Sequence, residues 1–183
     1  MLYAPAGVLL TINMKTLPYV GIASVWWELE GNGWKYVLLD LGKTIKKECG
    51  KLDMLAWQYN TVGVSDAVTM GNEGMRFSLP SRDLIADSLE TVTFAQHHDA
   101  CIAIPGCDKN MPGVTMAFTR HNRPSLMVYG GTIQAGYSQS LQRPINITTC
   151  YEMHGAYLYG KLQDYAKDKS REWDDDAVLY DVV

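Results

Sequence analysis

The chain has 183 residues, 47% of them hydrophobic, which is enough to bury a core and short enough to be read as one domain. Its 16 Lys and Arg residues against 20 Asp and Glu give a net charge of −4, so its electrostatics favour neither a nucleic-acid nor an anionic membrane partner. The best apolar run, residues 7–12, is far below the roughly 20 residues that a membrane-crossing helix needs.

Compartment signals are sparse. The N-terminal residues show neither the pattern of a signal peptide nor the Arg- and Ser-rich composition of a transit peptide. The four cysteines are widely spaced and contain no CxxC pair: Cys49, Cys101, Cys107 and Cys150. We therefore expect a reducing compartment and neither a disulfide scaffold nor a self-contained zinc knuckle.

Apolar, β-prone runs alternate along the chain with stretches of helical period, a pattern typical of a parallel sheet covered by helices. The predicted strands are residues 19–26, 55–59, 101–104 and 125–129. Between the first two strands, apolar residues recur at steps of three or four and predict a helix: Leu38, Leu41, Ile45, Cys49 and Leu52.

The second predicted helix starts at Ser81, a suitable N-cap after Pro80, and ends near His97 and His98, whose polar or cationic side chains would offset the terminal carbonyls. Its expected buried residues are Leu84, Ile85, Leu89, Val92 and Ala95. A third helix is predicted after Pro112, and a fourth over residues 151–166.

These elements predict an α/β fold, a three-layer α/β/α domain with a mainly parallel sheet over residues 19–166. Residues 1–18 form an N-terminal extension in this interpretation, and the charged residues 167–183 form an acidic tail expected to be poorly ordered. Ligands of such a fold bind at the carboxyl ends of the strands, where the loops 60–75 and 105–113 are expected to lie.

The loop 105–113 (PGCDKNMPG) carries a thiol, a carboxylate and an amine in consecutive positions: Cys107, Asp108 and Lys109. The amino end of the helix that follows would favour a thiolate at Cys107 and an ionised Asp108, which suits a metal or cluster ligand. The alternative is a buried small cysteine beside a surface ion pair.

Asp66 closes the loop 60–66 (NTVGVSD) and is the second candidate. Its carboxylate could meet Asp108 across a strand gap and hold a hard cation such as magnesium through oxygen ligands, unless it only caps a turn. After the fourth predicted strand, residues 130–132 (GGT) could bring backbone amides close to an anionic substrate, although such glycines are common without a ligand.

In combination, residues 60–66, 77–88 (FSLPSRDLIADS), 105–113 and 123–132 (RPSLMVYGGT) resemble the family of dihydroxy-acid and sugar-acid dehydratases. The resemblance runs from about residue 19 to about residue 166 and is nearest to fungal-looking dihydroxy-acid dehydratases. It implies a hydro-lyase of valine and isoleucine biosynthesis that converts 2,3-dihydroxy-3-methylbutanoate to 3-methyl-2-oxobutanoate. It also implies a homodimer, located in mitochondria if the source is fungal and otherwise in the cytoplasm.

The family binds an iron–sulfur cluster, as 2Fe-2S or 4Fe-4S, and a nearby Mg²⁺. The resemblance implies that Cys107 is a cluster ligand, that Asp66 and Asp108 are magnesium ligands, and that Lys109 is carbamylated to become a further magnesium ligand. It places the third cluster cysteine, a magnesium-binding glutamate and the serine base in later parts of the family chain, beyond Val183, so that no catalytic base is assigned to this chain.

One departure from the family pattern concerns the first cluster cysteine. Residues 25–34 (VWWELEGNGW) place Trp34 at that position, and an indole does not replace a thiolate as an iron ligand. We therefore expect this chain, as a truncated piece of the family enzyme, to be inactive by itself, and a non-catalytic remnant or interaction fragment is one alternative function.

A sugar-acid dehydratase of the same family is the second alternative. Nucleophilic catalysis by Cys107 is the third, and it would need one of four histidines as a nearby base: His97, His98, His121 or His154.

Overall fold

The structure is a computed structural model that describes residues 16–27, 37–131, 135–138 and 142–161. These residues fall into two compact units. The first contains β1 (Tyr19–Ser24), α2 (Val37–Lys51), β2 (Leu55–Asn60), α3 (Asp66–Thr69), the 3-10 helix η1 (Glu73–Phe77), α4 (Ser78–Ala95), β3 (Ala100–Ile104), α5 (Asn110–His121) and β4 (Ser125–Met127). The second contains β5 (Gly136–Ser138), β6 (Arg143–Ile145) and α6 (Ile147–Leu158).

The four strands of the first unit form one parallel sheet in the order β2-β1-β3-β4. Val20 of β1 lies between Ala56 and Ala100, which fixes the register on both sides. The predicted α/β fold with a parallel sheet is confirmed. Two strands are shorter than predicted, because β1 ends at Ser24, whose hydroxyl accepts a hydrogen bond from Trp26 N (3.1 Å), and β4 ends at Met127.

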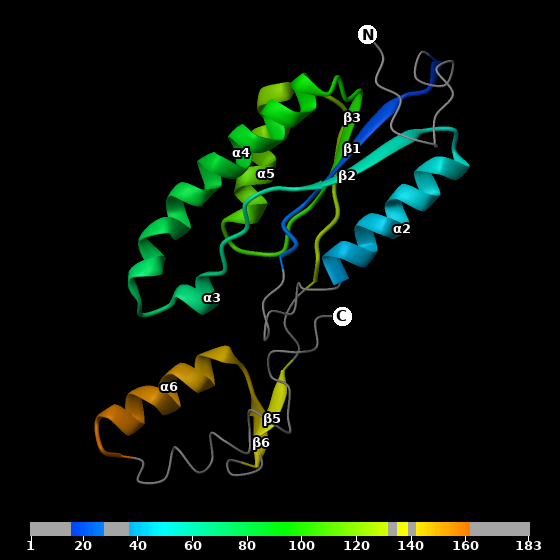
Figure 1. The fold of residues 1–183 in the computed structure, drawn as a ribbon. Helices are drawn as coiled ribbons and strands as arrows, with labels where there is room; N and C mark the ends of the chain where they lie inside the picture. Colours follow the sequence, from blue (N-terminus) through cyan, green and yellow to red (C-terminus); the bar gives the residue numbers. More distant parts are fainter. Residues whose placement is uncertain (1–15, 28–36, 132–134, 139–141, 162–183) are drawn as a thin grey trace. The chain divides into compact units, whose positions relative to one another are not determined.

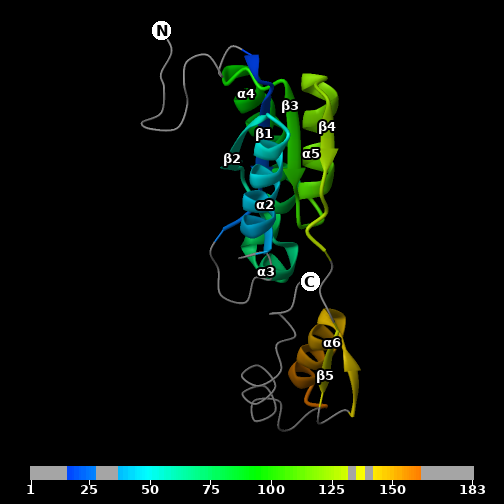
Figure 2. The same ribbon diagram turned by 90° about the vertical axis from the view of Figure 1, so that its right-hand side faces the viewer.

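Helices cover both faces of this sheet, which gives the expected three layers (Figures 1 and 2). α2 lies on one face, whereas α4 and α5 lie side by side on the other. The strand order reverses between β1 and β3, and in such sheets the crevice at the carboxyl ends of these two strands is the usual place for a ligand.

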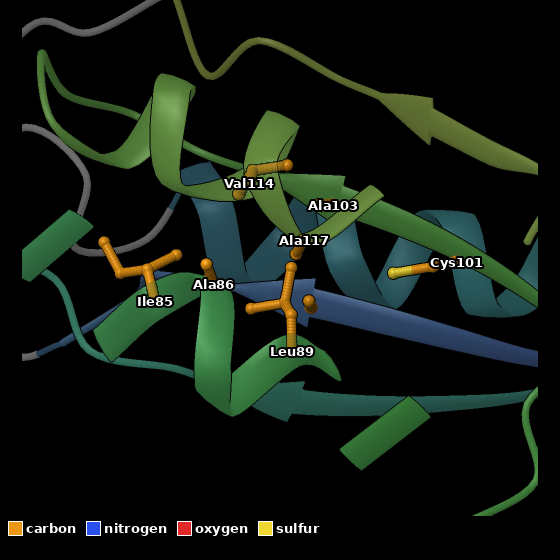
Figure 3. Close-up of a cluster of buried hydrophobic side chains, with 8 residues drawn as sticks. Ile85, Ala86, Leu89, Cys101, Ala103, Val114 and Ala117 are labelled. Atoms are coloured by element: carbon orange, nitrogen blue, oxygen red, sulfur yellow. The ribbon is translucent and has the colours of Figure 1, made fainter. Parts of the chain in front are cut away.

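The main core lies between the sheet and the α4–α5 pair (Figure 3). Its fully buried members are Ala23, Ile85, Ala86, Leu89, Cys101, Ala103, Val114 and Ala117. Many of these residues are small, and Gly113 shows why: a Cβ there would lie 2.8 Å from the backbone oxygen of Arg82. Because neither helix backbone can yield easily, the close approach of α4 and α5 depends on a residue without a side chain.

The predicted start of the second helix is wrong by three residues. α4 begins at Ser78, directly after η1, and Ser81 is a buried residue of its first turn rather than an N-cap. Pro80 is the third helical residue, where its missing N–H costs no helical hydrogen bond. α5 likewise begins at Asn110, so that Pro112 lies inside its first turn.

The predicted apolar faces are correct in part. Leu38 and Cys49 of α2 are buried, and Leu41 and Ile45 are half-buried, but Leu52 follows the helix and is exposed. In α4, Ile85 and Leu89 are buried as predicted and Val92 is half-buried, whereas Leu84 and Ala95 are exposed.

The end of α4 forms a Schellman motif, in which His97 N donates to Phe94 O (3.2 Å) and His98 N to Thr93 O (2.9 Å). His97 has a φ of 55°, in the left-handed region. A cationic capping role for His98 is wrong, because its imidazole is buried over Gly21 and beside the Tyr59 ring. Burial lowers the pKa of His98 below its ordinary value of 6.5, although the charge of Asp99 acts in the opposite direction.

This buried imidazole predicts a loss of stability in acid. Below pH 6.5 the unfolded chain protonates His98 while the folded state resists, so the free energy of unfolding falls until the pH reaches the lower folded pKa. One such group contributes at most about 1.4 kcal/mol per pH unit. In denaturant titrations between neutral pH and about pH 5.5, His98→Gln should show a smaller fall than wild type.

His97→Gln, a change at the exposed neighbour, is the matched control and should keep the wild-type fall. A residual dependence is expected in His98→Gln, because burial also lowers the pKa of His121. An unchanged fall in His98→Gln would contradict this assignment.

In the second unit, β5 and β6 form an antiparallel pair that was not predicted. α6 begins at Ile147 rather than residue 151, because Asn146 and Thr149 form a capping box at its start, and it ends at Leu158. Trp34, the predicted N-terminal extension up to residue 15 and the predicted tail 167–183 lie outside the described residues. Among the described helices, none has the length and apolar character to cross a membrane.

Candidate metal-binding site

The candidate side chains come from two loops at the carboxyl edge of the sheet. Asp66 is the first residue of α3, in the connection from β2 to α4. Cys107, Asp108 and Lys109 lie between β3 and α5. Because parallel strands bring their carboxyl ends to one edge, residues more than 40 positions apart in the sequence meet there.

Lys109 lies between two carboxylates. Its Nζ is 2.9 Å from Asp66 Oδ2 and also contacts Asp108 Oδ2. The other oxygen of Asp66, Oδ1, accepts a hydrogen bond of 2.5 Å from the Ser78 hydroxyl. The Asp66 and Lys109 side chains are largely buried, with 19% and 22% of their surface exposed, whereas that of Asp108 is 68% exposed.

The electrostatics follow from these contacts. Burial acts to raise the pKa of Asp66, but the Ser78 hydrogen bond and the Lys109 ammonium outweigh it and hold the pKa below its ordinary value. Hydrogen bonds to Asp108 and Asp66 raise the pKa of Lys109. The carboxylate of Asp66 is thus kept ionised, and positive charge is stabilised between the two aspartates.

Cys107 is half-buried beside the same groups. Burial raises the pKa of its thiol. Hydrogen bonds from the backbone N–H groups of Asp66 and Asp108 act to lower this pKa, whereas the charges of the two carboxylates act to raise it. The expectation that the loop favours a thiolate is therefore wrong for the protein without a metal. The two N–H groups nevertheless show that Cys107 lies against both candidate aspartates.

The other cysteines with described side chains lie elsewhere. Cys101 is the second residue of β3 and Cys49 lies in the last turn of α2, so both are at the amino edge of the sheet, opposite Cys107. Burial raises the pKa of Cys101 to about 11. Among the described side chains, Cys107 is thus the cysteine at the carboxyl edge. Trp34 and the side chain of Cys150 lie outside what the structure describes.

The oxygen donors fit a hard cation better than a soft one. Mg²⁺ binds oxygen ligands, commonly one or two carboxylates with water, and Asp66 and Asp108 are both in contact with one amine. A carbamyl group on Lys109 would replace the charge of that ammonium with a third carboxylate-like ligand. Among the described residues, no three His, Cys, Asp or Glu side chains form a metal site by themselves.

The thiol of Cys107 fits one ligand position of an iron–sulfur cluster, which needs further thiolates or other ligands. Within the described part of the chain, the geometry thus brings together two carboxylates, one amine and one thiol at this edge of the sheet. Two of the histidines proposed as a base for Cys107 lie away from it, since His98 follows the far end of α4 and His121 is the last residue of α5, and both are buried.

Two residues of this site were not predicted. Ser78 contacts Asp66 directly, and the available signal was a serine that begins a helix after a loop carrying an aspartate. Asn110 follows Lys109 and is fully buried, with neither amide atom hydrogen-bonded. A buried polar side chain without a hydrogen-bond partner lowers the stability of the fold, so Asn110 is a further candidate residue beside the site.

The diglycine after β4 has a packing role. A Cβ at Gly130 would lie 2.4 Å from Leu38 Cδ2 and 3.2 Å from Pro105 O, and Gly130 N donates to the same Pro105 oxygen (3.1 Å). This packing explains Gly130 without a ligand. Gly131 has a φ of 104°, and Thr132 lies outside the described residues.

Residues 17–175 match the family described as dihydroxy-acid/6-phosphogluconate dehydratase, N-terminal. The chain is 50% identical over 148 residues to the mitochondrial dihydroxy-acid dehydratase of Schizosaccharomyces pombe, a match covering 80% of this chain and 24% of the relative. It is 50% identical over 165 residues to the mitochondrial enzyme of Aspergillus fumigatus, covering 90% and 26%.

The similarity is not restricted to fungi. The chloroplastic dihydroxy-acid dehydratase of Arabidopsis thaliana is 48% identical over 158 residues, which cover 86% of this chain and 25% of the relative. The chain thus spans about a quarter of the length of the relatives that it matches. All the residues of the candidate site fall within the matched family segment.

Proposed function

Since the chain belongs to the dihydroxy-acid/6-phosphogluconate dehydratase family, we propose that its carboxyl-edge site serves the dehydration of a 2,3-dihydroxy acid to a 2-oxo acid. In this proposal Asp66, Asp108 and carbamylated Lys109 hold Mg²⁺, and Cys107 is one ligand of an iron–sulfur cluster. The observation that carries the proposal is the convergence of these four residues from two separate loops at one edge of the sheet.

When bound, the two metal groups would supply Lewis acidity toward the hydroxyl and carboxylate oxygens of the substrate. The protein residues would prepare the site for them. Ser78 fixes one oxygen of Asp66, and Lys109 links Asp66 to Asp108, so both carboxylates are already gathered around one point. Such preorganisation lowers the cost of ordering ligands when a metal binds.

Proton release accompanies metal uptake in this scheme. Cys107 would lose its thiol proton to become a ligand, although burial raises its pKa, and Lys109 would lose one ammonium proton before carbamylation and a second proton as the carbamate forms. Loading should therefore be favoured at alkaline pH and by bicarbonate. The overall reaction removes the C3 hydroxyl and the C2 hydrogen as one water molecule, and the resulting enol becomes the 2-oxo acid.

The specific substrate proposed is 2,3-dihydroxy-3-methylbutanoate, and hence valine and isoleucine biosynthesis, because the family resemblance implies it. A homodimeric enzyme belongs to the same proposal, and the mitochondrial names of the fungal relatives support a mitochondrial location. The test is to purify the chain without oxygen, to reconstitute it with iron, sulfide, Mg²⁺ and bicarbonate, and to measure both the cluster absorption and the 2-oxo acid formed. A sugar acid assayed in parallel identifies the substrate class.

Two results of this test are informative. The proposed ligands would be supported if Cys107→Ser abolished cluster uptake and Asp66→Asn abolished magnesium uptake. A chain that binds Mg²⁺ equally well with and without Asp66 would contradict the proposed magnesium site, whatever its turnover.

A further inference from the structure

We infer that Ser78 is a positioning residue for Asp66: its hydroxyl holds one carboxylate oxygen so that the other is presented for metal binding. The inference rests on the proposed function, because it assigns a role within the same magnesium site. Nothing in the sequence pattern singled out Ser78 for this role, and the geometry points to it.

Asp66 needs an anchor from outside its own loop. It begins α3, a helix of only four residues, and the preceding Ser65 makes no side-chain capping hydrogen bond. A carboxylate at such a place has two rotatable side-chain bonds and little local structure to fix them. The residue that holds its oxygen Oδ1 is Ser78, twelve positions later in the chain.

Ser78 is well placed to act as that anchor. It is the first residue of the 18-residue helix α4, it is 3% exposed, and its hydroxyl donates to Asp66 Oδ1 at 2.5 Å. The same turn is held by Ser81, whose hydroxyl donates to the Ser78 carbonyl oxygen at 2.6 Å. Because α4 packs against both α5 and the sheet, the anchor belongs to the well-packed part of the fold.

The two oxygens of Asp66 have different partners. Oδ1 faces Ser78, and Oδ2 faces Lys109 at 2.9 Å. A carboxylate whose second oxygen accepts a hydrogen bond has one defined oxygen available for a metal, and such outer partners typically change metal affinity about 10- to 100-fold. Ser78 therefore acts through Asp66 and makes no metal contact of its own.

The test compares Ser78→Ala with Ser81→Ala in the full chain, using Mn²⁺ as the probe in bicarbonate buffer. Both serines are buried in the first turn of α4, but Ser81 bonds only to the backbone in that turn, so it controls for a general loosening of the helix start. Affinity is measured by calorimetry and by the electron paramagnetic resonance signal of free Mn²⁺. We expect Ser78→Ala to weaken binding about 10- to 100-fold and Ser81→Ala to keep the wild-type affinity.

Ser78→Cys is measured beside these variants because it nearly keeps the side-chain volume while its thiol is a weak donor. It should also weaken Mn²⁺ binding, even if Ser78→Ala does not fold. Circular dichroism reports folding, and the unfolding free energies of Ser78→Ala, Asp66→Ala and the double variant report their coupling without metal. We expect the double variant to lose less unfolding free energy than the two single variants lose together, because either single change already removes the Ser78–Asp66 hydrogen bond.

The outcomes separate the inference from the proposed function. If wild type binds Mn²⁺ and the Ser78 variants bind equally well, the positioning role is wrong and the magnesium site stands. Equal losses in the Ser78 and Ser81 variants would also overturn it, because they would indicate a loosened turn. If wild type does not bind Mn²⁺, the proposed magnesium site itself is wrong and the inference fails with it.

Discussion

Replacing Leu89 by Ala is expected to lower the free energy of unfolding by about 3 kcal/mol. Leu89 is 0% exposed and belongs to the core between α4, α5 and the sheet, among alanines and other small residues (Figure 3). Small neighbours have no side-chain freedom with which to fill a cavity. The loss should therefore exceed the transfer free energy of the removed atoms alone. Chemical denaturation followed by circular dichroism measures it.

Leu84→Ala is the matched control. Leu84 lies on the same helix five positions earlier and is 55% exposed, so the same change there should alter the free energy of unfolding by no more than about 0.5 kcal/mol. Similar losses in both variants would show that α4 does not face the sheet as described. In that case α4 would not hold Ser78 beside Asp66 as described either.

The contrast between Leu84 and Leu89 shows where sequence periodicity was insufficient. Adjacent apolar residues at 84 and 85 allow two helix faces, and the prediction placed both on the buried side. The structure buries Ser81, Ile85, Ala86, Leu89 and Thr93. This face contains small and polar residues because α4 lies close against α5 at Gly113, and that closeness is a property of the pair of helices rather than of one segment.

The strands were predicted more successfully because each is an apolar, β-prone run bounded by turn residues, which is the pattern expected of parallel strands covered by helices on both faces. The helix starts were not. Pro80 and Pro112 were interpreted as boundaries, although both lie inside first turns, where proline is tolerated. The β5–β6 pair was not predicted because strands of three residues are too short to show an alternation of apolar and polar residues.

The candidate site was likewise predicted only in part. That Asp66 and Asp108 would meet followed from a general rule, that parallel strands deliver their following loops to one edge, and the structure brings Lys109 into contact with both. The state of the Cys107 thiol could not be predicted from the adjacent helix start, because burial opposes it and is invisible in the sequence. Ser78 was missed because its partner lies twelve residues away across a loop.

Asp66→Asn is expected to weaken Mg²⁺ or Mn²⁺ binding by at least about 100-fold, which corresponds to about 2.7 kcal/mol of binding free energy. The amide keeps the size of the carboxylate and still accepts the Ser78 hydrogen bond, so the change removes the charge and leaves the shape. Lys109 retains Asp108 as an ionic partner, so no buried cation is left alone and the variant should fold. Calorimetric titration of the purified chain with Mn²⁺ in bicarbonate buffer measures the effect.

Asp87→Asn provides the matched control because its setting has the same charge pattern. Arg120 lies between Asp87 (2.8 Å) and Glu90 (2.7 Å), as Lys109 lies between Asp66 and Asp108, but on the exposed side of the α4–α5 pair. Arginine cannot be carbamylated, and its fixed guanidinium occupies the space between the two acids. Asp87→Asn should therefore leave Mn²⁺ affinity unchanged. Equal losses in the two variants would mean that Mn²⁺ responds to net charge, and a wild-type affinity in Asp66→Asn would mean that Asp66 is not a ligand.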